Sequence, residues 1–176
     1  TKTFDCPLLY EDNTVSRINL AEEKSPIAVI VETPELPPFP FSLFQSEEAL
    51  NIDRAEAYAA AYQTKGTRPG DWQIPSAEQI QAVARNARAV QGTLLALENL
   101  AAKIDWGRYY LAARKSYDQY YLETVGIPCG KIFSIHNRGV DLVRLTIGKF
   151  NAVIYGYRLE NLFKIFPVSF FKDIQA

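Results

Sequence analysis

Hydrophobic residues in the middle of the chain recur at helical spacing, whereas those on either side favour strands. From 47 to 63 the apolar positions fall on one helical face, and Gly66 supplies a C-terminal stop. A second helix is predicted over 76–88, and a third helical stretch ends near Asp105, with Gly92 at a kink or boundary between them. We expect the apolar faces of these helices to lie in the core.

Segments rich in β-branched and aromatic residues predict strands before and after the helices. The first is 26–31, which carries proline at its first position, where a strand tolerates it. Four more follow Trp106-Gly107, with turn-forming residues at 126–130 and 136–139. These four are 108–114, 119–125, 131–135 and 140–145. Two or three helices against a twisted, mostly antiparallel sheet make an α+β fold.

Two segments before the first helix are less regular. Residues 1–24 are polar, and we interpret them as an N-terminal arm that adds at most one edge strand. Residues 34–44 contain four prolines and three phenylalanines, too much proline for a helix or a central strand. We therefore expect a loop pinned by Phe39, Phe41 and Phe44, with a polyproline ligand as the alternative.

The tail, residues 150–176, contains two further candidate strands, 152–157 and 162–168. Three aromatic residues, Phe166, Phe170 and Phe171, give this tail a large apolar surface. Packing onto the sheet is the favoured interpretation, and a contact with another molecule is the alternative.

The most informative stretch is 70–80, in which a turn, a tryptophan and a helix start follow one another. Trp72 is predicted to be a core anchor beside the helix entry. Pro75 fixes its own φ just before the helix. Ser76 can cap the helix, and Gln79, three residues on, can complete a capping box.

This Gly-Asp-Trp-x-Ile-Pro-Ser motif resembles the signature of a family of bacterial secreted domains, whose fold is similar to C-type lectins and to the formylglycine-generating enzyme. The resemblance covers about residues 25–147 and includes Tyr109-Tyr110 and Val143-Arg144. It departs at 111–115, where the family carries tryptophan and hydroxyl residues. The resemblance implies a single C-type-lectin-like domain over 1–176, with an N-terminal arm before the family-like core and the tail as an extension. Most members of the family have no assigned function.

Composition is that of an ordinary globular domain, with 48% hydrophobic and 22% charged residues. With 19 Lys+Arg against 20 Asp+Glu, the net charge of -1 gives no attraction to nucleic acid or to an anionic membrane. No apolar run approaches the ~20 residues of a membrane helix. Because the chain begins at Thr1 rather than Met, removal of an N-terminal signal or lipid anchor stays an open possibility.

Two cysteines and one histidine limit the chemistry that the chain can perform. Cys6 and Cys129 either form a disulfide that closes a long loop or remain as two buried thiols, and the sequence leaves both open. We expect His136 to lie exposed in a turn, because no nucleophile motif accompanies it. The sequence therefore predicts no enzyme, no cofactor and no metal site. The calcium-binding triplets of lectins are also missing.

A ligand surface remains as the candidate site. In lectin-like folds the loops and the exposed face of the small sheet carry the ligand, and tyrosine and arginine suit the recognition of sugars or proteins. The candidate ligand-binding residues are Arg114, Tyr117, Asp118, Tyr120, His136, Asn137 and Arg138. Solvated loop residues are the alternative interpretation. Arg144, flanked by Val143 and Leu145, is predicted to make a structural ion pair inside the fold.

Two hypotheses for function follow. The first is a non-enzymatic binding or adhesion module, secreted or anchored at the bacterial cell surface, that recognises a glycan or a protein. The alternative is a structural subunit or tip component of a surface assembly such as a pilus, in which the tail or the N-terminal arm contacts other subunits. The second hypothesis allows homo- or hetero-assembly.

Overall fold

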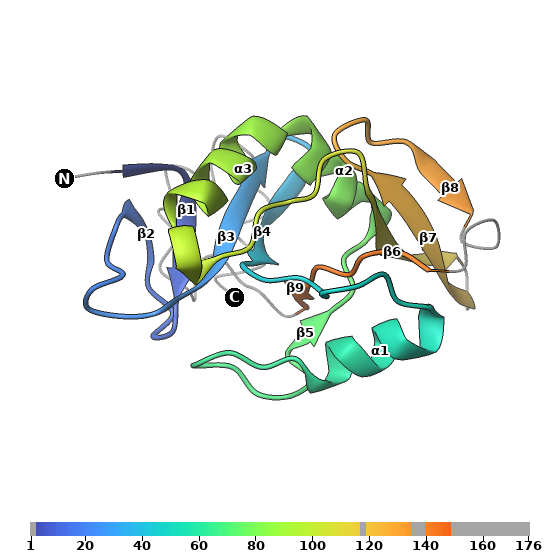
Figure 1. Ribbon diagram of the computed structural model, residues 1–176, viewed down its shortest axis with the longest axis horizontal. Coiled ribbons are helices and arrows are strands. Elements are labelled where there is room, and N and C mark those ends of the chain that lie inside the picture. Colours follow the sequence, from blue (N-terminus) through green and yellow to red (C-terminus); the bar gives the residue numbers. More distant parts are fainter. Residues whose placement is uncertain (1–2, 117–118, 135–139, 149–176) are drawn as a thin grey trace, which may run out of the picture.

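The structure is a computed structural model that describes residues 3–116, 119–134 and 140–148 (Figure 1). Over these ranges the chain has an α+β fold, as the sequence predicts. The helices are α1 (Ile52–Ala61), α2 (Ala77–Arg85) and α3 (Ala87–Ala96), followed by the 3₁₀ turn η1 (Glu98–Leu100). The strands are β1 (Thr3–Tyr10), β2 (Val15–Ile18), β3 (Pro26–Thr33), β4 (Leu36–Ser42), β5 (Trp72–Gln73), β6 (Tyr109–Ser116), β7 (Gln119–Gly126), β8 (Ile132–Ser134) and β9 (Thr146–Ile147). The predicted strands of the tail and the turn at 136–139 lie outside the described residues.

The described strands form three sheets, within which all strand pairs are antiparallel. The first sheet has the order β2-β1-β3-β4, the second pairs β5 with β9, and the third has the order β6-β7-β8. Helix α3 packs against β1 and β3, α2 packs against β6 and β7, and α1 lies beside β5 on the other side of the molecule (Figure 1). The single predicted sheet is therefore divided into three.

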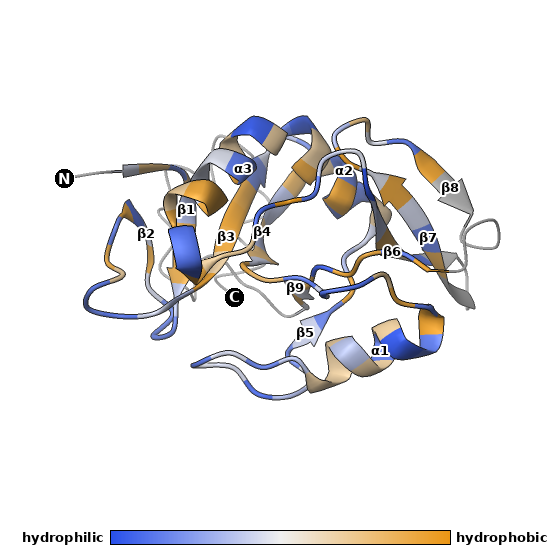
Figure 2. Cartoon of the chain, viewed as in Figure 1, coloured by the Kyte–Doolittle hydropathy of each residue, from blue (hydrophilic) through white to orange (hydrophobic). Residues whose placement is uncertain are grey.

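The two central strands of the first sheet, β1 and β3, carry buried residues on both faces. Leu8 and Val29 point into the apolar core beneath α2 and α3, while Leu9 and Ile30 point into a second core that contains Trp72. Figure 2 shows the resulting apolar residues along β1 and β3. Burial on both faces explains why the sequence of β3 is a continuous apolar run instead of an alternating one. No helix of the described residues is long and apolar enough to cross a membrane.

The N-terminal segment is an interior part of this sheet, so the prediction of an arm with one edge strand is wrong. Strand β1 pairs with β2 on one side and with β3 on the other. Its residues Phe4, Cys6, Leu8 and Tyr10 all belong to the core beneath the helices. They alternate along the strand, as a period of two requires. The residues between them are Asp5, Pro7 and Leu9, and because Leu9 is also apolar and buried, the alternation is not evident from the sequence.

The proline-rich segment is strand β4 rather than a loop, and this prediction is also wrong. It pairs with β3 in a register that places Pro40 opposite Ile30 and Phe41 opposite Val29. Strand β4 is the last strand of its sheet, where a residue without an N–H is tolerated. Phe39 is buried with Phe41, whereas Phe44 is 45% exposed and does not pin the segment.

The helix boundaries follow local capping. Helix α1 is shorter than predicted and begins after Asn51, whose side chain accepts from the Arg54 amide. The boundary between α2 and α3 is Asn86 and not Gly92, which lies inside α3. The Asn86 side chain donates to the Ala82 carbonyl at 2.8 Å, as does its backbone N–H at 3.1 Å, and these bonds end α2.

The tryptophan motif has the structure that its sequence predicts. Ser76 and Gln79 form a capping box, with both reciprocal bonds present. Trp72 is 2% exposed, and its indole Nε1 donates to Thr67 Oγ1 at 3.0 Å. The ring of Tyr62 meets it edge-on, with ring centroids 5.1 Å apart. Trp72 is therefore the anchor that joins the end of α1 to the start of α2.

The predicted strand at 140–145 is instead a series of single bridges followed by β9. Bridges join Asp141 to Leu50, Leu142 to Tyr110, and Arg144 to Gln45. Each bridge pairs this closing segment with a different part of the chain, because it crosses the loops between the first and third sheets.

Arg144 is the largest charged side chain of the interior and is 0% exposed. Its guanidinium lies 5.4 Å from the centre of the Phe41 ring, within cation–π range. Its hydrogen bonds go to neutral acceptors: Nε to the Ser42 carbonyl (2.7 Å), Nη2 to the carbonyls of Leu43 (2.6 Å) and Ala102 (2.7 Å), and Nη1 to Gln45 Oε1 (3.0 Å). We call these four acceptors the Arg144 cage.

The Arg144 cage replaces the predicted ion pair. The ion pairs among the described residues do not include Arg144. Burial lowers its pKa to about 10, so the guanidinium stays charged at neutral pH. Five N–H donors in a fixed fork suit several backbone carbonyls that converge from different loops.

We expect the replacement Arg144→Met to lower the free energy of unfolding by about 3 kcal/mol or more, because the buried carbonyls of the cage would lose their donors. Arg144→Lys should recover only part of this loss, because an ammonium group lacks the planar fork. Denaturant unfolding measures both. Arg54→Met, on the exposed face of α1, is the matched control and should change stability by less than about 0.5 kcal/mol. Full recovery by lysine would contradict the importance of the fork geometry.

Candidate functional site

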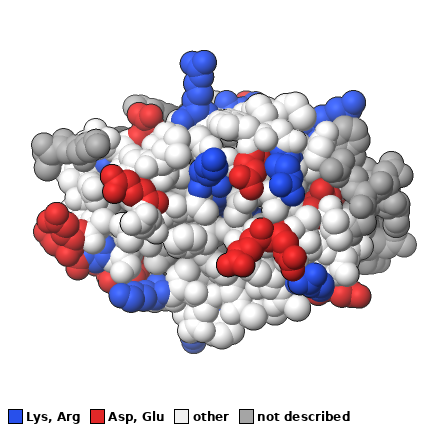
Figure 3. Space-filling view, viewed as in Figure 1, with Lys and Arg blue, Asp and Glu red and all other residues white. Residues whose placement is uncertain are grey.

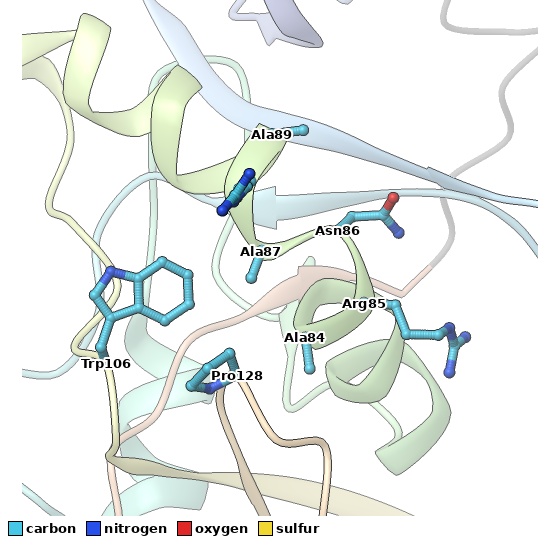
Figure 4. Close-up of a pocket in the computed structure, with 8 residues that line it drawn as sticks. Ala84, Arg85, Asn86, Ala87, Ala89, Trp106 and Pro128 are labelled. Carbon is cyan, nitrogen blue, oxygen red and sulfur yellow. The ribbon is translucent and has the colours of Figure 1, made fainter.

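A groove of about 700 Å³ lies at the junction of α2 and α3. One wall is the break between the two helices, and the opposite wall comes from the turns before β6 and after β7 (Figure 4). The lining residues are Ala84, Arg85, Asn86, Ala87, Arg88, Ala89, Trp106 and Pro128. Figure 4 shows the Trp106 indole across from the Ala87 methyl group, with Pro128 on the same wall as Trp106 and the side chains of Arg85 and Asn86 on the other side of the helix. The groove is therefore apolar where Trp106, Ala87 and Pro128 face one another, and the side chains of Arg85 and Asn86 extend away from this apolar part.

Trp106 is 46% exposed, in contrast to Trp72. A tryptophan has a large apolar face and a single N–H donor, so an exposed ring beside a groove is a surface suited to a ligand. Trp106 is not among the candidate ligand-binding residues that the sequence predicts, because in the sequence Trp106-Gly107 marks only the start of a strand. Its exposure depends on the positions of two turns that are distant in sequence, and no local pattern reveals it.

The backbone on each side of Trp106 is held firmly. Gln91 on α3 makes two bonds of 2.8 Å to the N–H and carbonyl of Ile104. The Asp105 N–H donates to the Tyr110 hydroxyl at 3.1 Å, and the Gly107 N–H donates to the Ile127 carbonyl at 2.8 Å. The platform that Trp106 provides is thus preorganised, which lowers the entropic cost of binding.

The Trp106 turn is also connected to the Arg144 cage. Gln45, a member of the cage, accepts from Tyr110 Oη at 2.7 Å and donates to Asp105 Oδ2 at 3.1 Å. Arg144 itself binds the Ala102 carbonyl, four residues before Trp106. One polar network of partly buried hydrogen bonds therefore connects Arg144 to the turn that carries the exposed ring.

The residues that line the groove include two cations, Arg85 and Arg88. Arg85 Nη2 lies 3.6 Å from Glu35 Oε2, and both side chains are more than half exposed, so this ion pair is weak. Arg88 makes no hydrogen bond or ion pair with any residue of the described part of the chain. The side-chain amide of Asn86 donates a hydrogen bond to the Ala82 carbonyl. Over the face seen in Figure 3, charges of both signs are interspersed.

The predicted ligand surface is at a different place, the end of the β6–β7 hairpin. Arg114 is exposed there, and its Nη1 donates to Glu123 Oε1 at 2.9 Å. The backbone of Tyr120 pairs with that of Lys115. The other predicted ligand-binding residues, Tyr117, Asp118, His136, Asn137 and Arg138, lie outside the described residues. Arg114 does not line the groove, so the structure does not bring it together with Trp106.

The Arg114 ion pair complicates the use of Arg114 in binding tests. Glu123 is buried, and its second oxygen, Oε2, has no hydrogen-bond partner in the described structure. Removal of Arg114 would leave a buried carboxylate without its cation, which destabilises a fold. A loss of binding in Arg114→Ala would therefore report on hairpin stability as well as on ligand contact.

The two cysteines are free in the structure, and only one is buried. Cys6 lies within the core beneath α3, and burial raises the pKa of its thiol to about 11. Cys129 is exposed in the turn after β7. The structure therefore has neither the disulfide nor the pair of buried thiols that the sequence left open. Within the described ranges, no group of three His, Cys, Asp or Glu residues is placed to hold a metal ion.

No family model, no curated protein and no solved structure matches this chain. The C-type-lectin-like identity suggested by the tryptophan motif stays a prediction, whereas the α+β class is established by the structure.

We expect alkylating reagents at pH 8 to modify Cys129 in the folded protein and to leave Cys6 unmodified, because Cys6 is inaccessible and its raised pKa keeps it a thiol. In denaturant both should react. Mass spectrometry of the labelled peptides measures each site separately. A bond between the two cysteines, seen as protection of both in denaturant without reductant, would contradict the structure.

The replacement Gln91→Leu should lower the free energy of unfolding by about 2 kcal/mol, because it leaves the buried N–H and carbonyl of Ile104 without partners. Thermal and denaturant unfolding measure the change. Gln81→Leu, which removes a single partly buried bond to the Gly130 carbonyl, is the comparison and should cost less. Equal losses of unfolding free energy in the two variants would contradict the prediction that the two bonds of Gln91 stabilise the fold more than the single bond of Gln81.

Proposed function

We propose that this domain is a non-enzymatic binding module that recognises a glycan in the groove at the α2–α3 junction. The observation that supports the proposal is the exposed indole of Trp106 on one wall of that groove. The apolar face of a sugar ring, made of C–H groups, can stack on such an indole. The hydroxyl groups at the ring edge can bond to polar side chains at the margin.

The geometry favours a small, extended ligand. Ala84, Ala87 and Ala89 keep the helix wall low, so a ring can approach without displacing large side chains. Pro128 adds a second rigid apolar surface on the wall that carries Trp106 (Figure 4). Since these surfaces are rigid and the Trp106 turn is held by buried bonds, binding requires little ordering of the protein.

A C-type-lectin-like fold and a secreted or cell-surface location are part of the same proposal, and the support for them is the resemblance of the tryptophan motif to bacterial secreted domains. We expect glycan binding to be independent of calcium, since the sequence lacks the calcium-binding triplets of lectins.

A glycan and matrix-protein array, probed with calcium and with chelator, tests the proposal. We expect glycan hits that persist in chelator and that Trp106→Ala weakens at least tenfold, because stacking on an aromatic ring is lost. Phe44→Ala removes another exposed aromatic ring outside the groove and should leave binding unchanged.

Three results would count against the proposal. Glycan hits that Trp106→Ala leaves intact would place the ligand elsewhere. Hits confined to matrix proteins would indicate a protein ligand. Hits that require calcium would contradict calcium-independent recognition.

A further inference from the structure

We propose that Tyr110 and Gln45 are positioning residues, whose buried hydroxyl and side-chain amide fix the orientation of the exposed Trp106 ring. The inference rests on the proposed function only for its consequence in binding, because the positioning itself is a property of the protein without ligand. It follows from the hydrogen bonds that reach the Trp106 turn, residues 104–108.

The turn is anchored differently on the two sides of Trp106. After Trp106, the Gly107 N–H donates to the backbone carbonyl of Ile127 at 2.8 Å. Before Trp106, the Asp105 N–H donates to the hydroxyl of Tyr110 at 3.1 Å. The N–H of the residue that precedes the ring therefore depends on a side-chain oxygen for its partner.

Tyr110 is a rigid support for this bond. It is 0% exposed, its backbone pairs with Val125 of β7 and bridges to Leu142, and its side chain belongs to the core beneath the helices. A hydroxyl in such a position costs free energy unless it is hydrogen-bonded. Tyr110 Oη has both a donor and an acceptor as partners, Asp105 and Gln45. A single oxygen atom thus joins the turn to the core.

The direction of each hydrogen bond is fixed by the groups that take part. Gln45 Oε1 can only accept, and it receives bonds from Tyr110 Oη at 2.7 Å and from Arg144 Nη1 at 3.0 Å. Burial raises the pKa of Tyr110, so its hydroxyl keeps the proton that it donates. The same oxygen then accepts from the Asp105 N–H. Since the Gln45 amide donates to Asp105 Oδ2 at 3.1 Å, Asp105 is held at two points.

Trp106 needs such support more than Trp72 does. Trp72 is 2% exposed and is held by the core, whereas Trp106 is 46% exposed. A ring that samples several orientations must be ordered when a ligand stacks on it, which weakens binding by about two- to tenfold. Bonds that fix the neighbouring residue, Asp105, reduce this loss.

Tyr110→Phe tests the hydroxyl, because it removes one oxygen and leaves the ring in the core. The Asp105 N–H loses its acceptor, so we expect its hydrogen exchange to become at least about tenfold faster. The order parameter of the Trp106 indole N–H, measured by NMR relaxation, should fall from the rigid range, about 0.85, toward the flexible range, below about 0.6. The indole N–H of buried Trp72 is the internal reference and should not change.

Tyr10 offers a matched control in the same core. It is also 0% exposed, and its hydroxyl accepts from the Leu20 N–H at 2.9 Å and donates to the Ile18 carbonyl at 3.0 Å. Tyr10 and its two partners do not line the groove. Tyr10→Phe should therefore speed the exchange of Leu20 and leave Trp106 unchanged. Equal loosening of Trp106 in the two variants would indicate a general loss of stability and would overturn the inference.

Gln45→Glu separates the positioning of Trp106 from the Arg144 cage. A carboxylate can still accept from Arg144 and from Tyr110, but its second oxygen would face Asp105 Oδ2 where the amide now donates. Because like charges repel, we expect the Trp106 order parameter to fall although the acceptors are kept. An unchanged order parameter would overturn the role of the Gln45 amide, and the same result in Tyr110→Phe would overturn that of the hydroxyl.

The outcomes separate this inference from the proposed function. If no glycan binds the wild-type protein, the proposed function fails, and the order parameters still decide whether Tyr110 positions Trp106. If a glycan binds in the groove, Tyr110→Phe should weaken it by about two- to tenfold, and Tyr10→Phe should not. Equal affinity of wild type and Tyr110→Phe would overturn the contribution of this positioning to recognition.

Discussion

The buried guanidinium of Arg144 is the constraint on which the arrangement of this domain depends. Strand β4, the loop at 102 and the closing segment approach one another without a common sheet, so their backbone groups cannot all be paired in a ladder. Arg144 bonds the carbonyls of Ser42, Leu43 and Ala102 at once. A charge in the interior is costly, and several convergent acceptors offset that cost. One side chain thereby joins three parts of the chain that are distant in sequence.

The same network reaches the surface. Gln45 Oε1 accepts hydrogen bonds from Arg144 and from the Tyr110 hydroxyl. Its amide N–H donates to Asp105, the residue before Trp106. On the other side, Gln91 fixes Ile104 to α3, which forms the opposite wall of the groove. The two walls are therefore connected through buried polar contacts rather than through loops alone. A change in the cage should move the indole relative to the helix, so stability and recognition are physically linked here.

The sequence predicts local features of this fold well and distant pairings poorly. The capping box of Ser76 and Gln79 depends on residues three apart, and the structure confirms it. Strand β1 was missed because its alternation is visible only once a partner strand and a helix define its two faces. Strand β4 was missed because its prolines are tolerated only at a sheet edge. The groove combines 84–89 with Trp106 and Pro128, and no spacing in the sequence brings these together.

Arginine has opposite uses in the interior and at the groove, and the difference lies in its acceptors. Arg144 is surrounded by carbonyls that the fold supplies, so its donors are satisfied and unavailable to a ligand. Arg88 lines the groove to which Trp106 also belongs, and it makes no hydrogen bond or ion pair with the described residues. Covering an exposed ring removes apolar surface from water, whereas covering a cation is favourable only when the partner supplies acceptors that replace its water. The same side chain therefore holds distant segments together where the fold surrounds it with carbonyls, and leaves its donors to solvent where the described chain does not.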